Sequence, residues 1–398
     1  MPTSEDILPK GISNDAINKL LESIGLPNAR KITAPRVDAK FHAIYMIGLP
    51  HHRNDRFRHI STNELVLRVA ANYWPRIKSE NEHGVMNCVR SRTSIPVPEV
   101  IGFDHSDKNP LGYEYSLLAR VPGETLSDIW QELDDKQMNG ILDQLANILA
   151  ELHSIDVEEI GGVVPEIGQD DNWQMGRVID ETFWANPQIT LWPSGETIDS
   201  LNIGGPFETY SDYISAQISL YIRQIRLHPN LKFFRRQTYA LEAFLASLRE
   251  HAEELNKTML ILAHKDLHFG NIMYDRDSGK ITGILDWEFS GVVPAPKWNP
   301  RKAFLWNCDD SENGKTAKAL LEERFAQRYN SMFPKQVQYT SPRQKAMQEI
   351  ADHVRAIIEV KVLDQRYSRT TQMQAQLDER VREWEKTISK ALEVFGIY

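Results

Sequence analysis

The sequence predicts an α+β protein of two lobes, a small β-rich N-terminal lobe followed by a larger helical C-terminal lobe. Its 398 residues exceed what one ordinary hydrophobic core organises. Strand-like runs concentrate in residues 37–121, and apolar stripes of helical period occupy much of residues 122–398. Residues 1–36 are expected to form an N-terminal helical extension, so we expect three consecutive segments with boundaries near residues 37 and 122.

Composition limits the class of protein. The chain is 41% hydrophobic and 25% charged, which is typical of a globular protein, and it has no apolar run of ~18 residues that would span a membrane. Its net charge of −9 disfavours nucleic acid as a partner. The two cysteines, Cys88 and Cys308, lie far apart, and the first residues carry no apolar signal segment. We therefore expect a cytoplasmic protein with reduced thiols.

The first elements follow from their apolar patterns. An amphipathic helix is expected at about Ser13–Ile24, followed by an irregular segment. The runs FHAIYMIGL and ELVLRVA indicate strands of the β-rich lobe. The segments Ser94–Asp104 and Tyr113–Leu126 are expected to complete this lobe, the second as a strand that runs into a glycine-containing turn.

The C-terminal lobe is predicted to be mainly helical. Ile141, Leu145, Leu149 and Leu152 belong to an i, i+3, i+4 stripe typical of a helix with one buried face. Further helices are expected at about Tyr210–Leu227, Thr238–Asn256, Pro342–Arg366 and Thr371–Phe395.

The most informative stretch is Leu262–Ser290, LAHKDLHFGNIMYDRDSGKITGILDWEFS. A short strand delivers His264 and Asp266 to a loop, and a hairpin with its turn at Asp277-Ser278-Gly279 returns Asp286 beside Asn271. Asp266, Asn271 and Asp286 can thus converge. Phosphoryl transfer needs such a set: one carboxylate to orient the attacking hydroxyl, and an Asn with a second carboxylate to hold Mg²⁺ on the phosphates.

The spacing is that of the kinase catalytic loop H-x-D-x-x-x-x-N, with Asp286 in place of the metal-binding Asp of D-F-G. The form HKDLHFGN…LDWEFSG resembles the aminoglycoside phosphotransferase and choline kinase-like family, closest to its fungal phosphotransferase branch. The resemblance implies a protein-kinase-like fold that uses ATP and Mg²⁺. It implies that His264, Asp266 and His268 form the catalytic group; His268 either contacts the γ-phosphate or only holds the loop. Asn271 and Asp286 would bind the metal and, through it, the nucleotide.

The resemblance also implies nucleotide-binding residues in the first lobe. Arg68, on the strand ELVLRVA, would hold the α- and β-phosphates, with Glu82 as its partner and Glu80 as the alternative. The backbone of the lobe hinge, at Ala119, Arg120 and Val121, would bind the adenine.

One departure concerns the loop expected to cover the phosphates. Residues Val37–Met46 contain no glycine to allow close backbone approach, so Lys40 or His42 would have to reach the phosphates with its side chain. This departure favours an alternative function, a catalytically silent kinase-like binding module. The intact Asp266, Asn271 and Asp286 oppose it.

The sequence signals for the acceptor-binding region are less specific. About a hundred residues, Asp156–Lys257, separate the apolar helix from the catalytic loop, and no A-P-E segment follows the hairpin, which both disfavour a protein kinase. The aromatic-rich piece Trp173–Trp192 either lines the acceptor pocket or packs in the core. Further acceptor-site candidates lie after the hairpin: Trp298, Trp306, Asp309 and Asp310.

The function expected from these patterns is ATP-dependent transfer of the γ-phosphate to a hydroxyl of a small metabolite or antibiotic-like acceptor. A silent module is the first alternative and a protein or lipid kinase the second. The identity of the acceptor, the choice of ATP or GTP and the oligomeric state stay open; a monomer would suffice for the predicted site.

Overall fold

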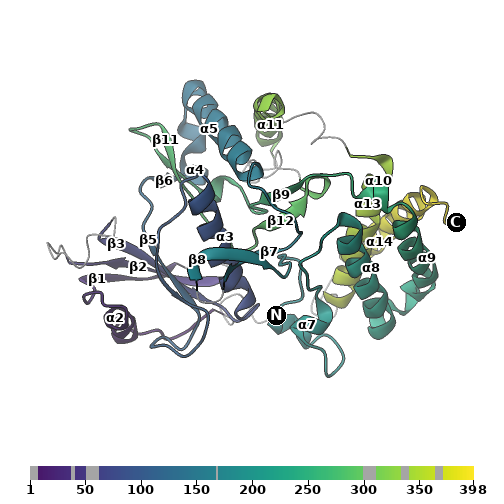
Figure 1. Cartoon of the computed structure of the whole chain (residues 1–398), viewed down its shortest axis with the longest axis horizontal. Helices are drawn as coiled ribbons and strands as arrows, with labels where there is room; N and C mark the ends of the chain where they lie inside the picture. The colour runs from purple at the N-terminus through teal and green to yellow at the C-terminus, as the bar shows by residue number, and fades with distance from the viewer. Residues whose placement is uncertain are drawn as a thin grey trace.

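The computed structural model describes residues 8–36, 41–50, 62–166, 169–298, 311–332, 340–363 and 371–398. An antiparallel sheet lies at one end of the molecule and a group of long helices at the other, with the short strands that carry the catalytic loop between them (Figure 1). Among the described residues, no helix combines the length and the apolar character needed to cross a bilayer.

The sheet has five strands in the order β1-β2-β3-β5-β4, with every neighbouring pair antiparallel. Its strands are β1 (Lys31–Arg36), β2 (His42–Gly48), β3 (Glu64–Ala70), β4 (Val100–Asp104) and β5 (Tyr115–Ala119). The strands expected for the first lobe are therefore present. Strand β1 differs from the prediction, which left residues 25–36 irregular, because its pairing with β2 supplies order that the local sequence does not signal.

Helix α2 (Asn14–Ser23) packs against this sheet, as its amphipathic pattern predicts. The Ser13 hydroxyl accepts a hydrogen bond from the Ala16 amide at 3.1 Å and so fixes the start of the helix. Its buried Ile17, Leu20 and Leu21 join the apolar side chains of β2, β3 and β5 in one core cluster.

Helix α3 (Ile77–Arg92) joins the sheet to the rest of the molecule. It lies against the hairpin of β7 (Gly162–Glu166) and β8 (Gln169–Gly176), where a Cβ on Gly84 would come within 2.3 Å of the Val163 carbonyl oxygen. Glycine at this position therefore allows the helix and the strand to approach closely. The hairpin lies within the predicted insertion and was not expected from the sequence.

The central part carries the catalytic loop. Its elements are β6 (Glu124–Thr125), α4 (Leu126–Ile129), η2 (Trp130–Glu132), α5 (Asp135–His153), β9 (Leu260–Ala263), η4 (Phe269–Asn271), β10 (Ile272–Asp275), β11 (Lys280–Ile284), β12 (Gly291–Pro294) and η5 (Ala295–Lys297). The predicted hairpin is formed by β10 and β11, β10 also pairs with β6, and β9 pairs with β12. The apolar stripe of α5 is buried against these strands, so the core beneath the loop is continuous.

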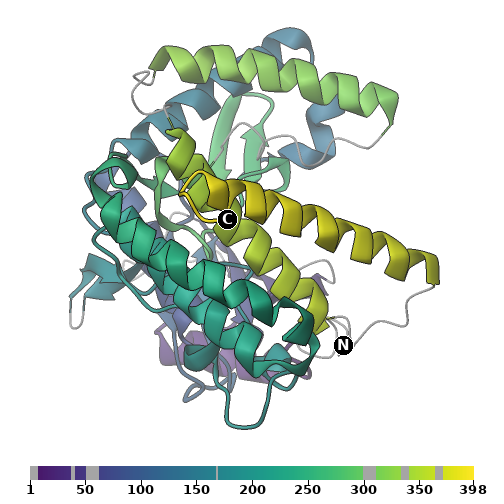
Figure 2. The same cartoon turned by 90° about the vertical axis from the view of Figure 1, so that its right-hand side faces the viewer.

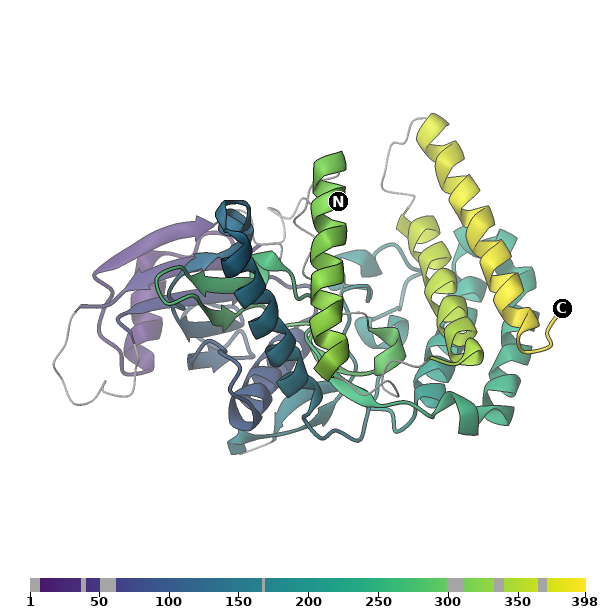
Figure 3. The ribbon, with the colours of Figure 1, turned by 90° about the horizontal axis from the view of Figure 1, so that it is seen from above.

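The helical end contains α8 (Tyr210–Leu227), η3 (Pro229–Gln237), α9 (Thr238–Glu250), α10 (Ala252–Leu255), α13 (Pro342–Leu363) and α14 (Thr371–Glu393). Figure 2 shows these helices side by side, and they share one core cluster. Two short helices, α6 (Asn186–Ile189) and α7 (Ile198–Leu201), precede α8. Helix α11 (Glu312–Met332) packs on α5, apart from the helical group (Figure 3). The four long helices expected here are present, whereas α11 was not foreseen.

Candidate active site

The catalytic loop begins where β9 ends, and His264 anchors it from inside. The His264 side chain is fully buried, its Nε2 lies 2.8 Å from the Leu285 carbonyl oxygen, and its Nδ1 lies 3.3 Å from the Asp266 amide. Burial lowers the pKa of this ring below its ordinary value, so it stays neutral. With both nitrogens turned to backbone groups, His264 holds the loop shape, and its predicted catalytic role becomes one of positioning.

Asp266 and Asn271 lie together in the loop, with Asp266 partly exposed and Asn271 buried. The Asn271 Nδ2 donates to the Asp266 carbonyl oxygen at 2.8 Å, and the Asp266 side chain is 30% exposed. His268 Nδ1 accepts from the Gly270 amide at 3.0 Å, and its Nε2 lies 3.7 Å from Asp266 Oδ1. A Cβ on Gly270 would come within 2.7 Å of the His268 ring, so a larger residue here would require the ring to shift.

The hairpin brings the second carboxylate to the same place. The Leu285 amide donates to the Asn271 carbonyl oxygen at 2.8 Å, which puts Asp286 next to the loop. Asp286 has φ of +65°, a left-handed conformation that side chains other than glycine adopt rarely. Its side chain is 32% exposed, and its Oδ1 accepts from Arg68 Nη2 at 2.7 Å. The three residues predicted to converge do so.

Arg68 connects the sheet with the catalytic loop. It extends from β3, its Nη1 donates to Glu82 of α3, and its Nη2 contacts Asp286. The structure thus selects Glu82 as the partner, while Glu80 pairs with Arg76 at 2.6 Å. Burial opposes ionisation of Asp286, but the charge of Arg68 outweighs it and lowers the pKa of the carboxyl, so it is ionised near neutral pH.

Two further buried groups that the sequence did not single out, Lys78 and Glu288, complete this ionic cluster together with His42. Glu288 Oε2 lies 2.5 Å from Lys78 Nζ, and Lys78 Nζ lies 2.8 Å from His42 Nε2. Burial, with Lys78 and Arg68 close by, holds the pKa of His42 well below its ordinary value, so the ring is neutral. Burial also raises the pKa of the Glu288 carboxyl, and the charge of Lys78 opposes this shift. His42 therefore lies behind Arg68 rather than free to reach a phosphate.

A sequence signal for Lys78 and Glu288 existed. Glu288 follows Asp286 by two residues, and Lys78 precedes Glu82 by one helical turn, so both lie on predicted site elements. Polar residues on α3 looked solvent-exposed, whereas Lys78, Asn81 and Glu82 are each at most 2% exposed. Lys40, the other residue expected near the phosphates, lies outside the described residues.

The predicted hinge uses part of its backbone for the sheet. The Ala119 amide donates to the Glu99 carbonyl at 2.8 Å, and the Arg120 amide donates to the Glu64 carbonyl at 2.8 Å. In the described part of the chain, the Val121 amide has no backbone acceptor. Of the three predicted adenine-binding residues, Val121 is thus the one whose N–H is available for a base.

The site also suits a hard divalent cation. Because the Asn271 amide nitrogen is turned to Asp266, its Oδ1 is left without a donor among the described residues, near the ionised Asp286 carboxylate. Mg²⁺ prefers such oxygen ligands and commonly takes only one or two from the protein, the rest coming from phosphates and water. No cluster of three or more His, Cys, Asp or Glu suited to a metal occurs in the described ranges.

The aromatic acceptor-site candidates belong to the packing. Trp184 and Trp192 are 2% and 5% exposed and pack edge to face inside the helical core, with ring centroids 5.0 Å apart. Trp298 lies edge-on to His153, with ring centroids 5.3 Å apart. The segment Trp173–Trp192 nevertheless reaches the catalytic loop, because the Ile179 carbonyl accepts from Lys265 Nζ at 2.8 Å. Trp306, Asp309 and Asp310 lie outside the described residues.

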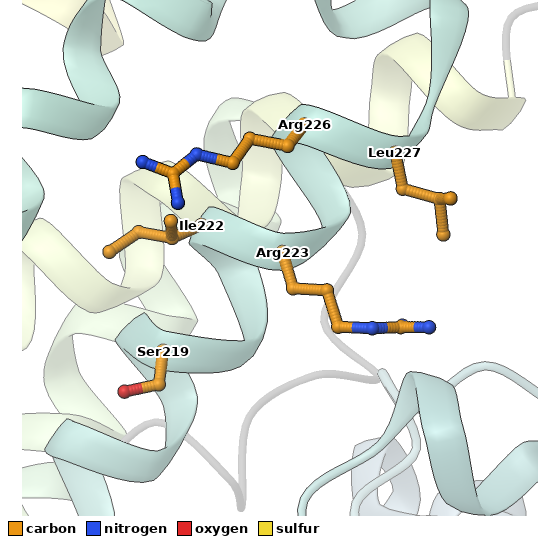
Figure 4. A pocket seen from close by; sticks show the side chains of 5 residues that line it. All are labelled: Ser219, Ile222, Arg223, Arg226 and Leu227. Carbon is orange, nitrogen blue, oxygen red and sulfur yellow. The ribbon is translucent and has the colours of Figure 1, made fainter.

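A hollow of about 460 Å³ lies along α8 and is lined by Ser219, Ile222, Arg223, Arg226 and Leu227 (Figure 4). Arg223 donates to Glu196 at 2.6 Å and Arg226 to Glu242 at 2.5 Å, so both charges are already paired. The lining residues all come from α8, away from the catalytic loop. We therefore do not assign the acceptor to this hollow.

Known proteins share this sequence pattern and this fold. The Phosphotransferase enzyme family matches residues 48–295. A subtelomeric hrmA-associated cluster protein of Aspergillus fumigatus is 22% identical over 261 residues, which is 54% of this chain and 50% of that protein. Clavilactone A biosynthesis cluster protein Y of Ampulloclitocybe clavipes is 26% identical over 228 residues, 56% of this chain and 52% of that protein. The chain thus spans about half the length of these curated relatives.

Solved structures agree on the fold. ADP-bound aminoglycoside phosphotransferase APH(2'')-Ib superposes with a TM-score of 0.50 at 14% identity, covering 95% of this chain and 98% of that one. The family match spans more than half of the chain and contains the catalytic loop, Arg68 and Asp286. This protein is therefore a member of the phosphotransferase enzyme family, with the two-part α+β fold of the aminoglycoside phosphotransferases.

Proposed function

We propose that this protein is a small-molecule kinase that transfers the γ-phosphate of ATP to a hydroxyl group, with Mg²⁺ as cofactor. The observation that carries the proposal is the meeting of Asp266, Asn271 and Asp286 at one place, with Arg68 reaching it from the sheet. These are the parts that phosphoryl transfer requires, since its catalysis consists mainly of positioning and charge stabilisation.

Asp266 is assigned to the acceptor. Its carboxylate orients the attacking hydroxyl and accepts the proton as the new phosphorus–oxygen bond forms and the bond from the γ-phosphorus to ADP breaks. Its partial exposure makes it accessible, in contrast to the buried His264. His268, 23% exposed and hydrogen-bonded to the Gly270 amide, is assigned to hold the loop.

Asn271 and Asp286 are assigned to the metal. When bound, Mg²⁺ neutralises charge on the phosphates. Arg68, kept in place by Glu82, is assigned to the α- and β-phosphates, and the hinge of Ala119, Arg120 and Val121 to the adenine. Arg68 also contacts Asp286 at 2.7 Å, which holds the groups assigned to the phosphates and to the metal next to each other.

The relatives favour a small acceptor. One is named for the biosynthesis cluster of clavilactone A, another for a subtelomeric gene cluster, and the structural neighbour is an aminoglycoside phosphotransferase. The helices α8, α9 and α10 occupy the insertion before the catalytic loop, where a protein kinase has none. We propose an acceptor that is a metabolite or antibiotic-like compound.

Metal-dependent nucleotide binding is the first test. Thermal unfolding is measured with ATP, GTP or ADP, with and without Mg²⁺, on the wild type, on Asp286→Ala and on Asp277→Ala, an exposed aspartate in the turn of the same hairpin. A nucleotide at ~100 times its dissociation constant adds about 2.7 kcal/mol of stability. We expect this shift to need Mg²⁺ and to be lost only in Asp286→Ala. No shift with any nucleotide would favour the silent binding module instead.

A further inference from the structure

Two lysines next to the catalytic loop lack a carboxylate partner. Lys265 directly precedes Asp266, and its Nζ donates to the Ile179 carbonyl at 2.8 Å. Lys297, at the end of η5, donates to the Tyr213 hydroxyl at 2.7 Å and lies over the same ring, 5.0 Å from its centroid. Among the described residues, no carboxylate oxygen lies within 4.0 Å of either ammonium group.

Asp180 is a negative charge that acts on both lysines, and it is turned elsewhere. Its Oδ1 accepts from the Thr182 amide at 3.0 Å and from the Thr182 hydroxyl at 2.7 Å. Burial opposes ionisation of Asp180, but the charges of Lys297 and Lys265 lower the pKa of its carboxyl, although it contacts neither. Asp352 also acts on Lys297 from beyond 4.0 Å, so the negative charges that act on the two lysines do so without a direct contact.

The two cations of the ionic cluster are paired with carboxylates. Lys78 contacts Glu288 at 2.5 Å, and Arg68 contacts both Glu82 and Asp286. Removing an ammonium group from water without an opposite charge is unfavourable, so such groups normally have a partner. The half-buried Lys265 and Lys297, close to the catalytic loop where a substrate is expected, have no such carboxylate contact.

Their position fits a substrate that starts at Asp266. Lys265 extends from the catalytic loop to the segment of Ile179, and Lys297 continues the row of donors towards α8 through Tyr213. Figure 1 shows β9 and β12, which lead into these two lysines, between the sheet and helix α8. An acceptor with its hydroxyl at Asp266 would meet these ammonium groups next.

We propose that the acceptor carries an anionic group, a carboxylate or a phosphate, near the hydroxyl that receives the phosphoryl group, and that Lys265 and Lys297 bind it. Lys297 and Tyr213 thereby determine specificity for acidic acceptors. This inference deepens the proposed function and rests on it.

Four matched probes test the charge preference: glycerol, 3-amino-1,2-propanediol, D-glycerate and glycerol 3-phosphate. They share one small hydroxylated body and differ in whether they carry no charge, an amine, a carboxylate or a phosphate. Binding is measured by ligand-observed NMR, which needs no turnover. We expect at least one of the two anionic probes to bind tenfold or more tightly than glycerol and the amine.

Substitutions then assign that preference to the site. Lys297→Met should abolish it, Tyr213→Phe should weaken it without removing a charge, and Lys345→Met, at a lysine that is 73% exposed on α13, should leave it unchanged. If Lys297→Met does not fold, Tyr213→Phe alone decides. Absence of binding by both anionic probes, preference for the amine, or an anion preference that survives the substitutions would overturn the proposal.

This outcome is separable from a failure of the proposed function. Nucleotide binding depends on Asn271, Asp286 and Arg68 and not on Lys297. A protein that binds Mg²⁺ and nucleotide but shows no anion preference would retain the kinase proposal and lose this one. A protein that binds the anionic probes but no nucleotide would lose the kinase proposal.

Discussion

At the scale of single residues, Arg68 has the most demanding position in the molecule. Its guanidinium contacts Glu82 from α3 and Asp286 from the catalytic hairpin, residues that are far apart in the sequence. Two donors in a planar fork can serve both carboxylates at once, whereas a lysine has one nitrogen for both. The presence of arginine here follows from this geometry.

Arg68→Lys is therefore expected to weaken binding of the Mg²⁺–nucleotide complex by about tenfold or more, although the charge is kept. Titration calorimetry measures the effect. Arg76→Lys is the matched control, since Arg76 directly precedes α3, is 73% exposed and pairs with Glu80. Equal affinities in the wild type and in Arg68→Lys would contradict the assigned role.

Asp266 should affect turnover and not nucleotide binding. Asp266→Asn keeps the shape of the side chain but cannot accept the hydroxyl proton, and such groups contribute typically about 10² to 10⁴ in rate. We expect a loss of this size in ADP release once an acceptor is known, with an unchanged nucleotide dissociation constant. A variant with normal turnover would remove Asp266 from the mechanism.

The pH dependence of acceptor binding should reflect Lys265. Burial lowers the pKa of its ammonium group to about 8, although Asp180 opposes this shift and Lys297 adds to it. The group is charged below this pH and neutral above it. Affinity for an anionic probe should thus fall as the pH rises from 7 to 9, while affinity for glycerol stays constant. NMR titrations at several pH values measure both, and a flat profile for the anionic probe would argue against Lys265 as a ligand.

At the scale of elements, helices and strands were predictable where a local sequence pattern specifies them. They were not predictable where contacts with distant segments do. Helices α8, α13 and α14 begin at the predicted residues, because an amphipathic stripe is a local signal. Strand β1, the β7–β8 hairpin and helix α11 were missed. Their order depends on contacts with distant segments, as the approach of Gly84 in α3 to Val163 in β7 illustrates.

Two helical glycines, one in close contact with a distant strand and one beside open space, allow a test of these long-range contacts. Gly84→Ala would put a Cβ 2.3 Å from the backbone oxygen of Val163, so α3 must shift, whereas a Cβ on Gly140 in α5 meets nothing within 4 Å. Gly140→Ala should stabilise the protein by about 0.5–1 kcal/mol, the helix propensity difference. Gly84→Ala should destabilise it by about 1–3 kcal/mol through overpacking. Urea unfolding measures both, and equal effects would show that α3 and β7 are not in close contact.

At the scale of the whole molecule, the site exists only because the two ends of the fold are held together. The catalytic motif was predictable, since its residues lie within one hairpin-containing stretch of the sequence. The buried roles of Lys78, Glu288 and His42 were not, because an isolated sequence gives no sign that a polar helix face lies against a distant loop. The acceptor-side lysines were missed for a similar reason. Lys265 and Lys297 are positioned by hydrogen bonds to Ile179 and Tyr213, which are distant in the sequence.

Asn81 offers the most direct test of this connection. Its side chain is buried in α3, its Oδ1 accepts from the Val163 amide at 2.9 Å, and its Nδ2 donates to the carbonyl oxygens of Glu288 at 3.0 Å and Ser290 at 2.9 Å. One residue thus joins α3 to the β7–β8 hairpin and to the segment that follows Asp286. An unsatisfied buried polar group costs about 1–3 kcal/mol.

Asn81→Ala should therefore lower the free energy of unfolding by about 3 kcal/mol or more, and should also weaken nucleotide binding, because the backbone after Asp286 loses its support. Asn72→Ala is the control: Asn72 is exposed, bonds only to the side chain of Asn186, and should change stability by less than about 0.5 kcal/mol. Chemical unfolding followed by calorimetry with Mg²⁺–nucleotide measures both effects on the same samples. A variant that is destabilised but binds nucleotide normally would show that α3 supports the fold without shaping the site, whereas loss of both would show that one buried amide couples them.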